Sequence, residues 1–309
     1  MLVRAQIQFK AAHFSGRRAE AEQAVRDVDR VELGDNPKVL QLRILALLTA
    51  AHTARTDQSA HAAFLKQAGE IDQKLARLPD DPTAIEGRLW YLYTAGDEDA
   101  LLKFIRDNRA HIKTVTGFEI EILFRRKRFA EALEYVRADP SPDNHLWLRA
   151  QAILCAPLGR RDEAERLFSQ SMQTNSEYQL SEALPYMRVL GPGRLIDPNQ
   201  VARDLLEHSS RSIPDWRGGW YRALCRFNAG ELDADQLLAK AGDSAANRCE
   251  AYFHIGMYRL GEGKRAEAKR HFANACDTGV FTFGEYQWSR AFLGCIDDPE
   301  GLPWLAEKK

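Results

Sequence analysis

The sequence predicts an all-α solenoid of about eight antiparallel helix pairs, followed by a C-terminal capping helix. Three observations predict this fold. A short turn motif recurs along the chain, runs with apolar residues three and four apart flank each copy, and Ala100, Ala132 and Ala164 are separated by equal intervals of 32 residues. The clearest copies of the motif are 16–21, 159–164 and 263–268, and the weaker ones are 127–132 and 96–100.

The runs that flank each turn predict amphipathic helices. Leu89 and Tyr93 come before the turn at 96–100, and Phe104 and Ile105 come after it. This spacing puts one apolar stripe on each helix of a pair. Because the turn between the two helices is short, they must pack against each other as an antiparallel hairpin.

The helix pairs follow one another along the whole chain, so residues 1–309 are expected to form a single solenoid. The clearest repeats are 83–108, 115–138, 146–176 and 249–279. Less regular pairs are predicted at 5–33, at 37–54 with 57–77, at 177–190 with 198–208, and at 215–229 with 233–240. Residues 281–293 predict the capping helix, because the last repeat would otherwise expose its apolar face.

The last pair carries the most complete version of a known pattern. Tyr252 opens its first helix and Gly256 follows four positions later, while Ala268, Phe272 and Ala275 form a small–aromatic–small triplet in its second helix. This pair resembles the tetratricopeptide repeat, and the resemblance extends in weaker form over most of the chain. It implies a right-handed superhelix whose first helices line a concave face that binds partners.

First-helix residues that lie off the core-facing stripe are the candidates for a partner-binding groove. They are Ile85, Leu89, Glu121, Phe124, Arg149, Ile153, Trp216, Arg226, Phe253 and Met257. This mixture of apolar and charged groups favours an amphipathic helix or an extended peptide with apolar anchors. Trp216 and Trp220 are candidate hot-spot residues, since tryptophan dominates many interfaces. The alternative is that these side chains pack between neighbouring repeats.

The turns between paired helices are rich in basic residues, and equivalent turns of a solenoid line up along one edge. The basic residues of this edge are Arg17, Arg18, Arg126, Lys127, Arg128, Arg160, Arg161, Lys264 and Arg265. Such an edge suits an acidic partner or a nucleic-acid backbone. The alternative is local compensation, because Glu20, Glu163 and Glu267 flank the same turns and exposed ion pairs contribute little.

The tail, roughly residues 285–304, is similar to the C-terminal ends of tetratricopeptide regions in large bacterial serine/threonine kinases of planctomycete type. This resemblance implies a second hypothesis, a regulatory module of a signalling enzyme. The chain itself has no kinase signature: it lacks a Gly-rich loop with a following Lys, a His-Arg-Asp and an Asp-Phe-Gly. Residues 302–305, Leu-Pro-Trp-Leu, are expected to fold back onto the capping helix.

Catalytic patterns are scarce in the sequence. The eight histidines include no His-Glu-x-x-His, and Gly-Pro-Gly at 191–193 is too short to cradle phosphates. His254 and His271 are expected to pack or to lie at the surface. The five cysteines are scattered without a Cys-x-x-Cys pair, so neither a disulfide framework nor a zinc site is favoured. We therefore expect no enzyme, no metal and no cofactor.

Composition favours a folded cytoplasmic protein whose partner is another protein or a peptide. Hydrophobic residues make up 45% of the chain, and 43 Lys and Arg against 44 Asp and Glu give a net charge of −1. Nucleic acid is not favoured, because its binding domains usually carry a basic excess. Residues 1–6 lack the basic-then-apolar run of a secretion signal, and the longest apolar run is far shorter than a membrane-spanning helix.

Overall fold

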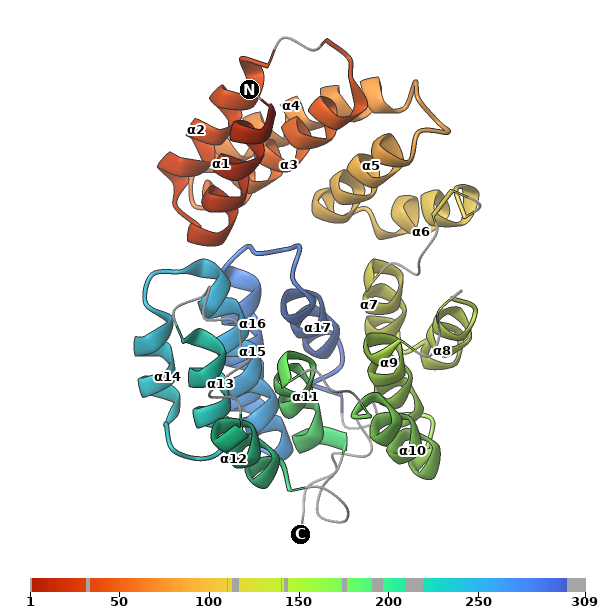
Figure 1. Cartoon of the computed structure of the whole chain (residues 1–309). Coiled ribbons are helices and arrows are strands. Elements are labelled where there is room, and N and C mark those ends of the chain that lie inside the picture. Colours follow the sequence, from red (N-terminus) through yellow and green to blue (C-terminus); the bar gives the residue numbers. More distant parts are fainter. Residues whose placement is uncertain are drawn as a thin grey trace. The chain divides into compact units, whose positions relative to one another are not determined.

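The computed structural model of the chain describes residues 2–31, 34–109, 111–112, 117–139, 141, 144–173, 177–190, 197–208 and 219–298. All regular secondary structure in these ranges is helical, as the sequence predicts (Figure 1). The helices are α1 (Leu2–Ser15), α2 (Arg18–Asp29), α3 (Pro37–Thr53), α4 (Gln58–Leu75), α5 (Pro82–Ala95), α6 (Glu98–Asp107), α7 (Gly117–Arg125), α8 (Phe129–Arg137), α9 (His145–Cys155), α10 (Arg161–Ser171), α11 (Glu177–Leu190), α12 (Pro198–His208), α13 (Trp220–Asn228), α14 (Ala234–Ala241), α15 (Ala245–Gly261), α16 (Arg265–Asp277) and α17 (Gly284–Leu293). None of these described helices is long and apolar enough to cross a membrane.

The chain folds as two compact units. The first comprises residues 1–114 with the short segments 244–246 and 278–280, and the second comprises 115–243, 247–277 and 281–309. The first unit thus holds α1–α6, and the second holds α7–α17 apart from the first residues of α15. The single solenoid over 1–309, its right-handed superhelix and its eight pairs remain predictions.

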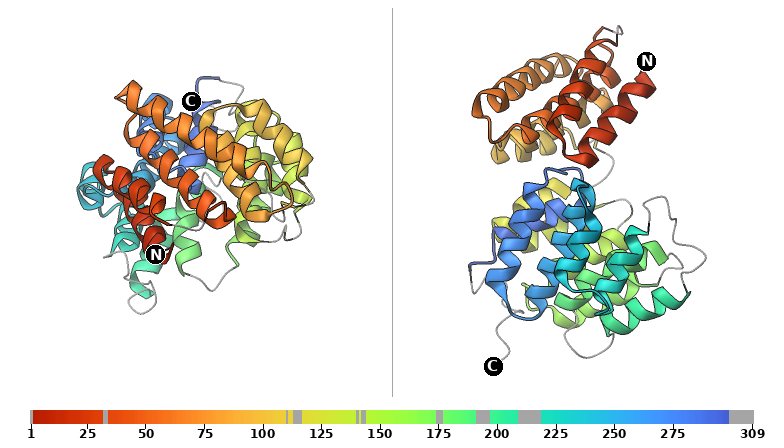
Figure 2. Two further views of the ribbon diagram at one scale, coloured as in Figure 1. Left: turned by 90° about the horizontal axis from the view of Figure 1, so that it is seen from above. Right: turned by 90° about the vertical axis from the view of Figure 1, so that its left-hand side faces the viewer.

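The first unit is built around α3. This helix contacts α1, α2, α4 and α5, and α1–α4 lie side by side (Figure 2). Leu40 and Ile44 of α3 are fully buried, and most of its other residues are buried as well. A helix that is apolar on all sides has to be surrounded by other elements. On α4, Leu75 is buried, whereas Phe64 and Ile71 are partly exposed.

The second unit joins its first helix to its last. Helix α17 contacts both α16 and α7, although α7 lies far from it in the sequence (Figure 1). The ring centroids of Phe124 on α7 and Phe292 on α17 are 5.6 Å apart, and Phe292 stacks on Phe272 of α16 at 5.4 Å. The predicted capping helix therefore forms and covers α16, and it also packs against the helix that opens the unit.

Most predicted helix boundaries agree with the structure. The segments 177–190 and 198–208 are α11 and α12, and the predicted pair 37–54 and 57–77 is α3 and α4. The expected interrepeat bend at 191–193 and the expected fold-back of 302–305 lie outside the described residues.

A residue in the left-handed conformation lies two positions before the second helix of each motif-bearing pair. The backbone φ is 68° at Gly16, 82° at Gly96, 71° at Gly159 and 80° at Gly263, and Lys127 takes the same position with φ 56°. Glycine adopts this conformation readily, whereas a residue with a Cβ atom is strained in it. The turn motif in the sequence therefore reflects a backbone requirement, which Lys127 meets at a cost.

The same turn fixes the register of the repeats. In each copy, the residue before the second helix accepts at its carbonyl a hydrogen bond from the amide four positions later. The donors are Ala21, Leu101, Ala132, Ala164 and Ala268, at 2.9–3.0 Å. Leu101, which is buried, is thus the equivalent of Ala132 and Ala164, while Ala100 is only partly buried. The equal spacing of the alanines does not match the structural spacing, which is 31 residues from Leu101 to Ala132 and then 32 to Ala164.

Candidate functional site

Eight of the ten predicted groove residues are buried. The side chains of Ile85, Leu89, Glu121, Phe124, Arg149, Ile153, Phe253 and Met257 are each at most 5% exposed. Arg226 is partly exposed, and Trp216 lies outside the described residues. Their burial agrees with the alternative that these side chains pack against neighbouring helices, and it does not agree with an open groove lined by all eight. Helical spacing alone does not separate the face that packs on the next pair from the face that meets solvent.

Glu121 and Arg149 nevertheless border a cavity of about 210 Å³ in the second unit. Its walls come from α7, α9, α11 and α17, and the first three are the first helices of their pairs. The apolar lining consists of Ile120, Leu146, Trp147, Ala150, Tyr186, Trp288 and Ala291. We call this cavity, with these residues, the aromatic pocket. The groove prediction did not include Trp288, because α17 is expected from the sequence only to cap the last repeat.

Glu121 supplies negative charge to one wall of the aromatic pocket, and two arginines neutralise it. Its carboxylate, only 1% exposed, lies 3.1 Å from Nε of Arg125 and 3.1 Å from Nε of Arg290. Arg125 is on the same helix, whereas Arg290 is on α17, so the carboxylate ties α7 to α17. A buried carboxylate is tolerated when opposite charges surround it in this way.

Arg149 on α9 is engaged by the neighbouring helix α11. Its Nη2 donates a 3.0 Å hydrogen bond to the carbonyl of Gln179, and its Nη1 lies 3.9 Å from the carboxylate of Glu182. Both charged residues of the aromatic pocket therefore hold helices together. The surface that the pocket offers to a ligand is mainly apolar.

The aromatic pocket combines fixed rings with an exposed apolar side chain. Trp288 lies edge-on to Tyr186, with centroids 6.3 Å apart, and edge-on to Phe124 at 5.8 Å. Burial raises the pKa of the Tyr186 phenol well above its usual value, so this side chain stays neutral. Leu146, which is 50% exposed, lies at the same cavity. A concave pocket lined mainly by apolar and aromatic side chains is a common form of binding site.

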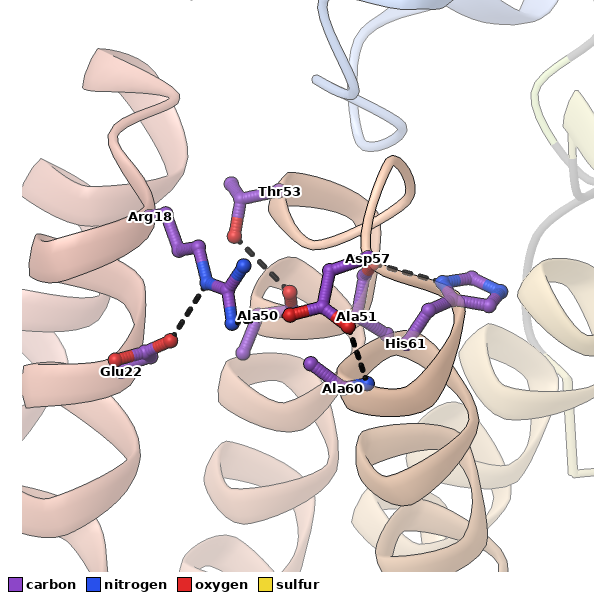
Figure 3. Close-up of polar contacts among 8 residues, drawn as sticks. All are labelled: Arg18, Glu22, Ala50, Ala51, Thr53, Asp57, Ala60 and His61. Atoms are coloured by element: carbon purple, nitrogen blue, oxygen red, sulfur yellow. Dashed lines mark hydrogen bonds and ion pairs between the residues drawn. The ribbon is translucent and has the colours of Figure 1, made fainter.

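In the first unit, the basic turn is compensated locally. Nε of Arg18 donates to the carboxylate of Glu22 at 2.8 Å, and Nη2 donates to the carboxylate of Asp57 at 3.1 Å (Figure 3). Asp57 also caps α4 by accepting the amide of Ala60 at 3.1 Å, and this bond together with Arg18 lowers the pKa of its carboxyl. Arg17 pairs with Glu20 at 2.9 Å. Arg18 thus joins α2 to the start of α4, whereas the pair of Arg17 stays within α2 and its preceding turn.

In the second unit, acidic residues also accompany the basic turns. Lys127 forms an ion pair with the carboxylate of Asp298, and Nη1 of Arg265 donates to the carbonyl of Asp298 at 3.2 Å. Further pairs are Arg128 with Glu131, Arg160 with Glu163 and Lys264 with Glu262. Local compensation therefore describes most of the predicted basic edge. Arg126 and Arg161 lie exposed at the same turns, as predicted.

Trp220 has a structural position. Its side chain is 3% exposed, and its indole N–H donates to the buried carboxylate of Glu250 on α15. It therefore fixes the start of α13 against α15 and is not available as the exposed anchor that the sequence suggested.

Two of the cysteines are held in an unreactive form. Burial raises the pKa of the Cys155 and Cys295 thiols to about 11, and a protonated thiol is a poor nucleophile. His254 is buried beside Asn228, and the ring of His271 lies 6.1 Å from that of Tyr252, so the two histidines have different neighbours. Within the described ranges, no group of three or more His, Cys, Asp or Glu side chains is placed to hold a metal ion.

No protein-family model matches the chain, and the comparison with curated proteins gives no match either. By its fold and its site, the chain is an all-helical protein with an apolar pocket lined by aromatic rings. Most of the pocket is built from the first helices of consecutive helix pairs.

Proposed function

We propose that the chain is a tetratricopeptide-like scaffold that binds an amphipathic helix or extended peptide of another protein. One apolar side chain of that partner enters the aromatic pocket. The observation that carries this proposal is the apolar cavity among α7, α9, α11 and α17, with Leu146 exposed beside it.

The size of the aromatic pocket supports a peptide anchor. Sites for small organic ligands usually enclose about 300–1,000 Å³, and this cavity encloses about 210 Å³. One leucine-sized or phenylalanine-sized side chain suits such a space. A few anchors of this kind supply most of the binding energy in many interfaces.

The position of the aromatic pocket supports the family resemblance. Tetratricopeptide proteins are expected to receive partners on their first helices, and α7, α9 and α11 are the first helices of three consecutive pairs. The basic edge is a weaker candidate, because most of its charges pair with acidic neighbours. The regulatory module of a kinase remains a prediction, and the pocket is compatible with it.

Substitution of Leu146 tests the proposal without altering the core. Peptides that bind the whole chain are first selected from a displayed random library, and their affinities are then measured for variants. The change Leu146→Asp puts a charge at the pocket and should weaken binding at least about tenfold, roughly 1.4 kcal/mol. The matched control is Ile7→Asp, because Ile7 is also an exposed aliphatic residue, 63% exposed, but lies on α1 of the first unit.

The control should leave the affinity unchanged. Failure to select any peptide with apolar anchors, or equal loss in both variants, would overturn the proposal. Charge reversal at Arg149 is less informative, because that side chain is buried and the change would disturb the contact between α9 and α11.

A further inference from the structure

A second cavity, of about 370 Å³, lies in the second unit among α13, α14 and α15. Arg222 and Arg226 of α13, Lys240 of α14 and Asn247 of α15 line it, together with Gly219 and Trp220 at the start of α13. We call this cavity the cationic pocket. It shares no lining residue with the aromatic pocket.

The lining of the cationic pocket carries an excess of positive charge. Arg222 and Arg226 are four positions apart, so both project from one face of α13, and Lys240 joins them from the adjacent helix. Arg226 pairs through Nε with Glu231 at 2.9 Å. No carboxylate among the described residues forms an ion pair with Arg222 or Lys240. Two cations thus border one cavity without a balancing acid from the described part of the chain.

The donor groups around the cationic pocket suit an oxyanion. Arginine offers several N–H donors that match phosphate geometry, and lysine adds a mobile point charge. The Asn247 amide is an uncharged polar group beside them. Gly219, the residue before α13, also borders the cavity and has no side chain of its own to cap this helix. The buried Glu250 accepts the indole N–H of Trp220 and is not among the lining residues.

We propose that the cationic pocket binds the phosphate group of a small phosphorylated molecule. The volume falls in the range of small-ligand sites, which leaves room for a phosphate and a modest organic group. A nucleic-acid strand fits less well, because a polyanion needs a continuous basic track. Here Glu231, Asp233, Asp235 and Asp243 are exposed acidic residues close by in the sequence on α14 and its flanking turns.

Calorimetric titration of the whole chain tests this site, with inorganic phosphate, O-phosphoserine and adenosine monophosphate as probes in low-salt buffer. The first variants are Arg222→Glu and Lys240→Glu, which change exposed side chains and are expected to fold. The control is Arg270→Glu, which makes the same charge change at an exposed position of α16. Circular dichroism checks that each variant keeps its helical content.

The site is supported if at least one probe binds saturably and two further results follow. Arg222→Glu and Lys240→Glu should each weaken the affinity for that probe about tenfold or more, and Arg270→Glu should weaken it less than about twofold. The preferred probe then shows whether free phosphate, a phosphorylated side chain or a nucleotide is the better source of the group. Absence of saturable binding at concentrations up to about 10 mM would overturn the proposal. Equal weakening by Arg270→Glu, or equal affinity for acetate, would also overturn it, because only the general charge would then matter.

Discussion

Sγ of Cys295 donates a buried 3.2 Å hydrogen bond to the main-chain carbonyl of Phe124, although the two residues are 171 positions apart. The bond joins the segment after α17 to the last turn of α7. The same two helices share the Glu121 ion pairs and the contact of Phe124 with Phe292. Because α7 and α17 form part of the wall of the aromatic pocket, the pocket depends on this long-range packing.

Removal of the Phe292 ring should strongly destabilise the second unit. Phe292 is fully buried and lies against rings of α7, α16 and α17 itself. The change Phe292→Ala should lower the free energy of unfolding by about 3–5 kcal/mol, since buried Phe→Ala changes lose both burial and packing. Urea unfolding followed by tryptophan fluorescence measures this. Val3→Ala, at a position 68% exposed, should change it by less than about 0.5 kcal/mol. A loss below about 1 kcal/mol for Phe292→Ala would show that α17 is not firmly packed.

Loss of the Glu121 charge should also destabilise the second unit. Glu121→Gln leaves Arg125 and Arg290 facing a neutral group in a mostly buried site. The expected loss in the free energy of unfolding is about 3 kcal/mol, as for other buried pairs from which one partner is removed. Glu131→Gln is the matched control, because Glu131 pairs with Arg128 at the surface and should contribute less than about 1 kcal/mol. Equal effects of the two changes would contradict the structural role of Glu121.

Lys127 provides a test of the repeat turns. Its positive φ occurs where the other four copies of the motif have glycine. Lys127→Gly should raise the free energy of unfolding by up to about 1 kcal/mol through relief of this strain. Lys127→Ala controls for loss of the ion pair with Asp298, because it removes the charge but keeps Cβ.

The reverse change, Gly159→Ala, should lower stability by about 1 kcal/mol. Apart from the two chain neighbours, no residue in the described part of the chain lies within 4 Å of the added Cβ, so backbone conformation is what the change tests. If both substitutions were neutral, the shared left-handed turn would not matter energetically.

The local sequence pattern was sufficient to predict the helices but not the surfaces that could bind a partner. Apolar spacing placed α11 and α12 to the residue, and the turn motif located left-handed residues that the structure has at Gly16, Gly159 and Gly263. The sequence pattern aligned Ala100 with Ala132 and Ala164, but the structure aligns Leu101 with them. Alanine and leucine both suit an inward position, and only the backbone hydrogen bond from the Leu101 amide shows which residue is the equivalent one.

The candidate sites were less predictable because they depend on contacts between distant segments. Glu121 and Arg149 were identified from their helix faces, but the contact of α7 with α17 that buries Glu121 and completes the aromatic pocket has no local signal. Trp288 was seen only as part of a capping helix. The cationic pocket was missed for the same reason, since Arg222, Lys240 and Asn247 come from three helices and form no sequence motif.

The last prediction concerns His254, whose burial makes the second unit sensitive to acid. Nδ2 of Asn228 lies 3.0 Å from Nδ1 of the imidazole, and burial lowers the pKa of His254 from 6.5 to about 3. The unfolded chain therefore binds a proton below about pH 6.5 that the folded chain does not bind until about pH 3. The contribution of neutral His254 to the free energy of unfolding is complete above pH 6.5 and is lost as the pH falls towards 3.

Between pH 7 and pH 5 this linkage should cost about 2 kcal/mol of unfolding free energy. His254→Gln removes the titrating group and keeps an acceptor for Asn228, so its stability should depend less on pH by about that amount. Urea unfolding of both proteins at the two pH values gives the difference directly, whatever the variant does to stability at neutral pH. The buried His13 of the first unit is present in both proteins, so its own pH dependence cancels in the comparison. An identical pH dependence in the two proteins would mean that His254 is protonated, or solvated, in the folded state.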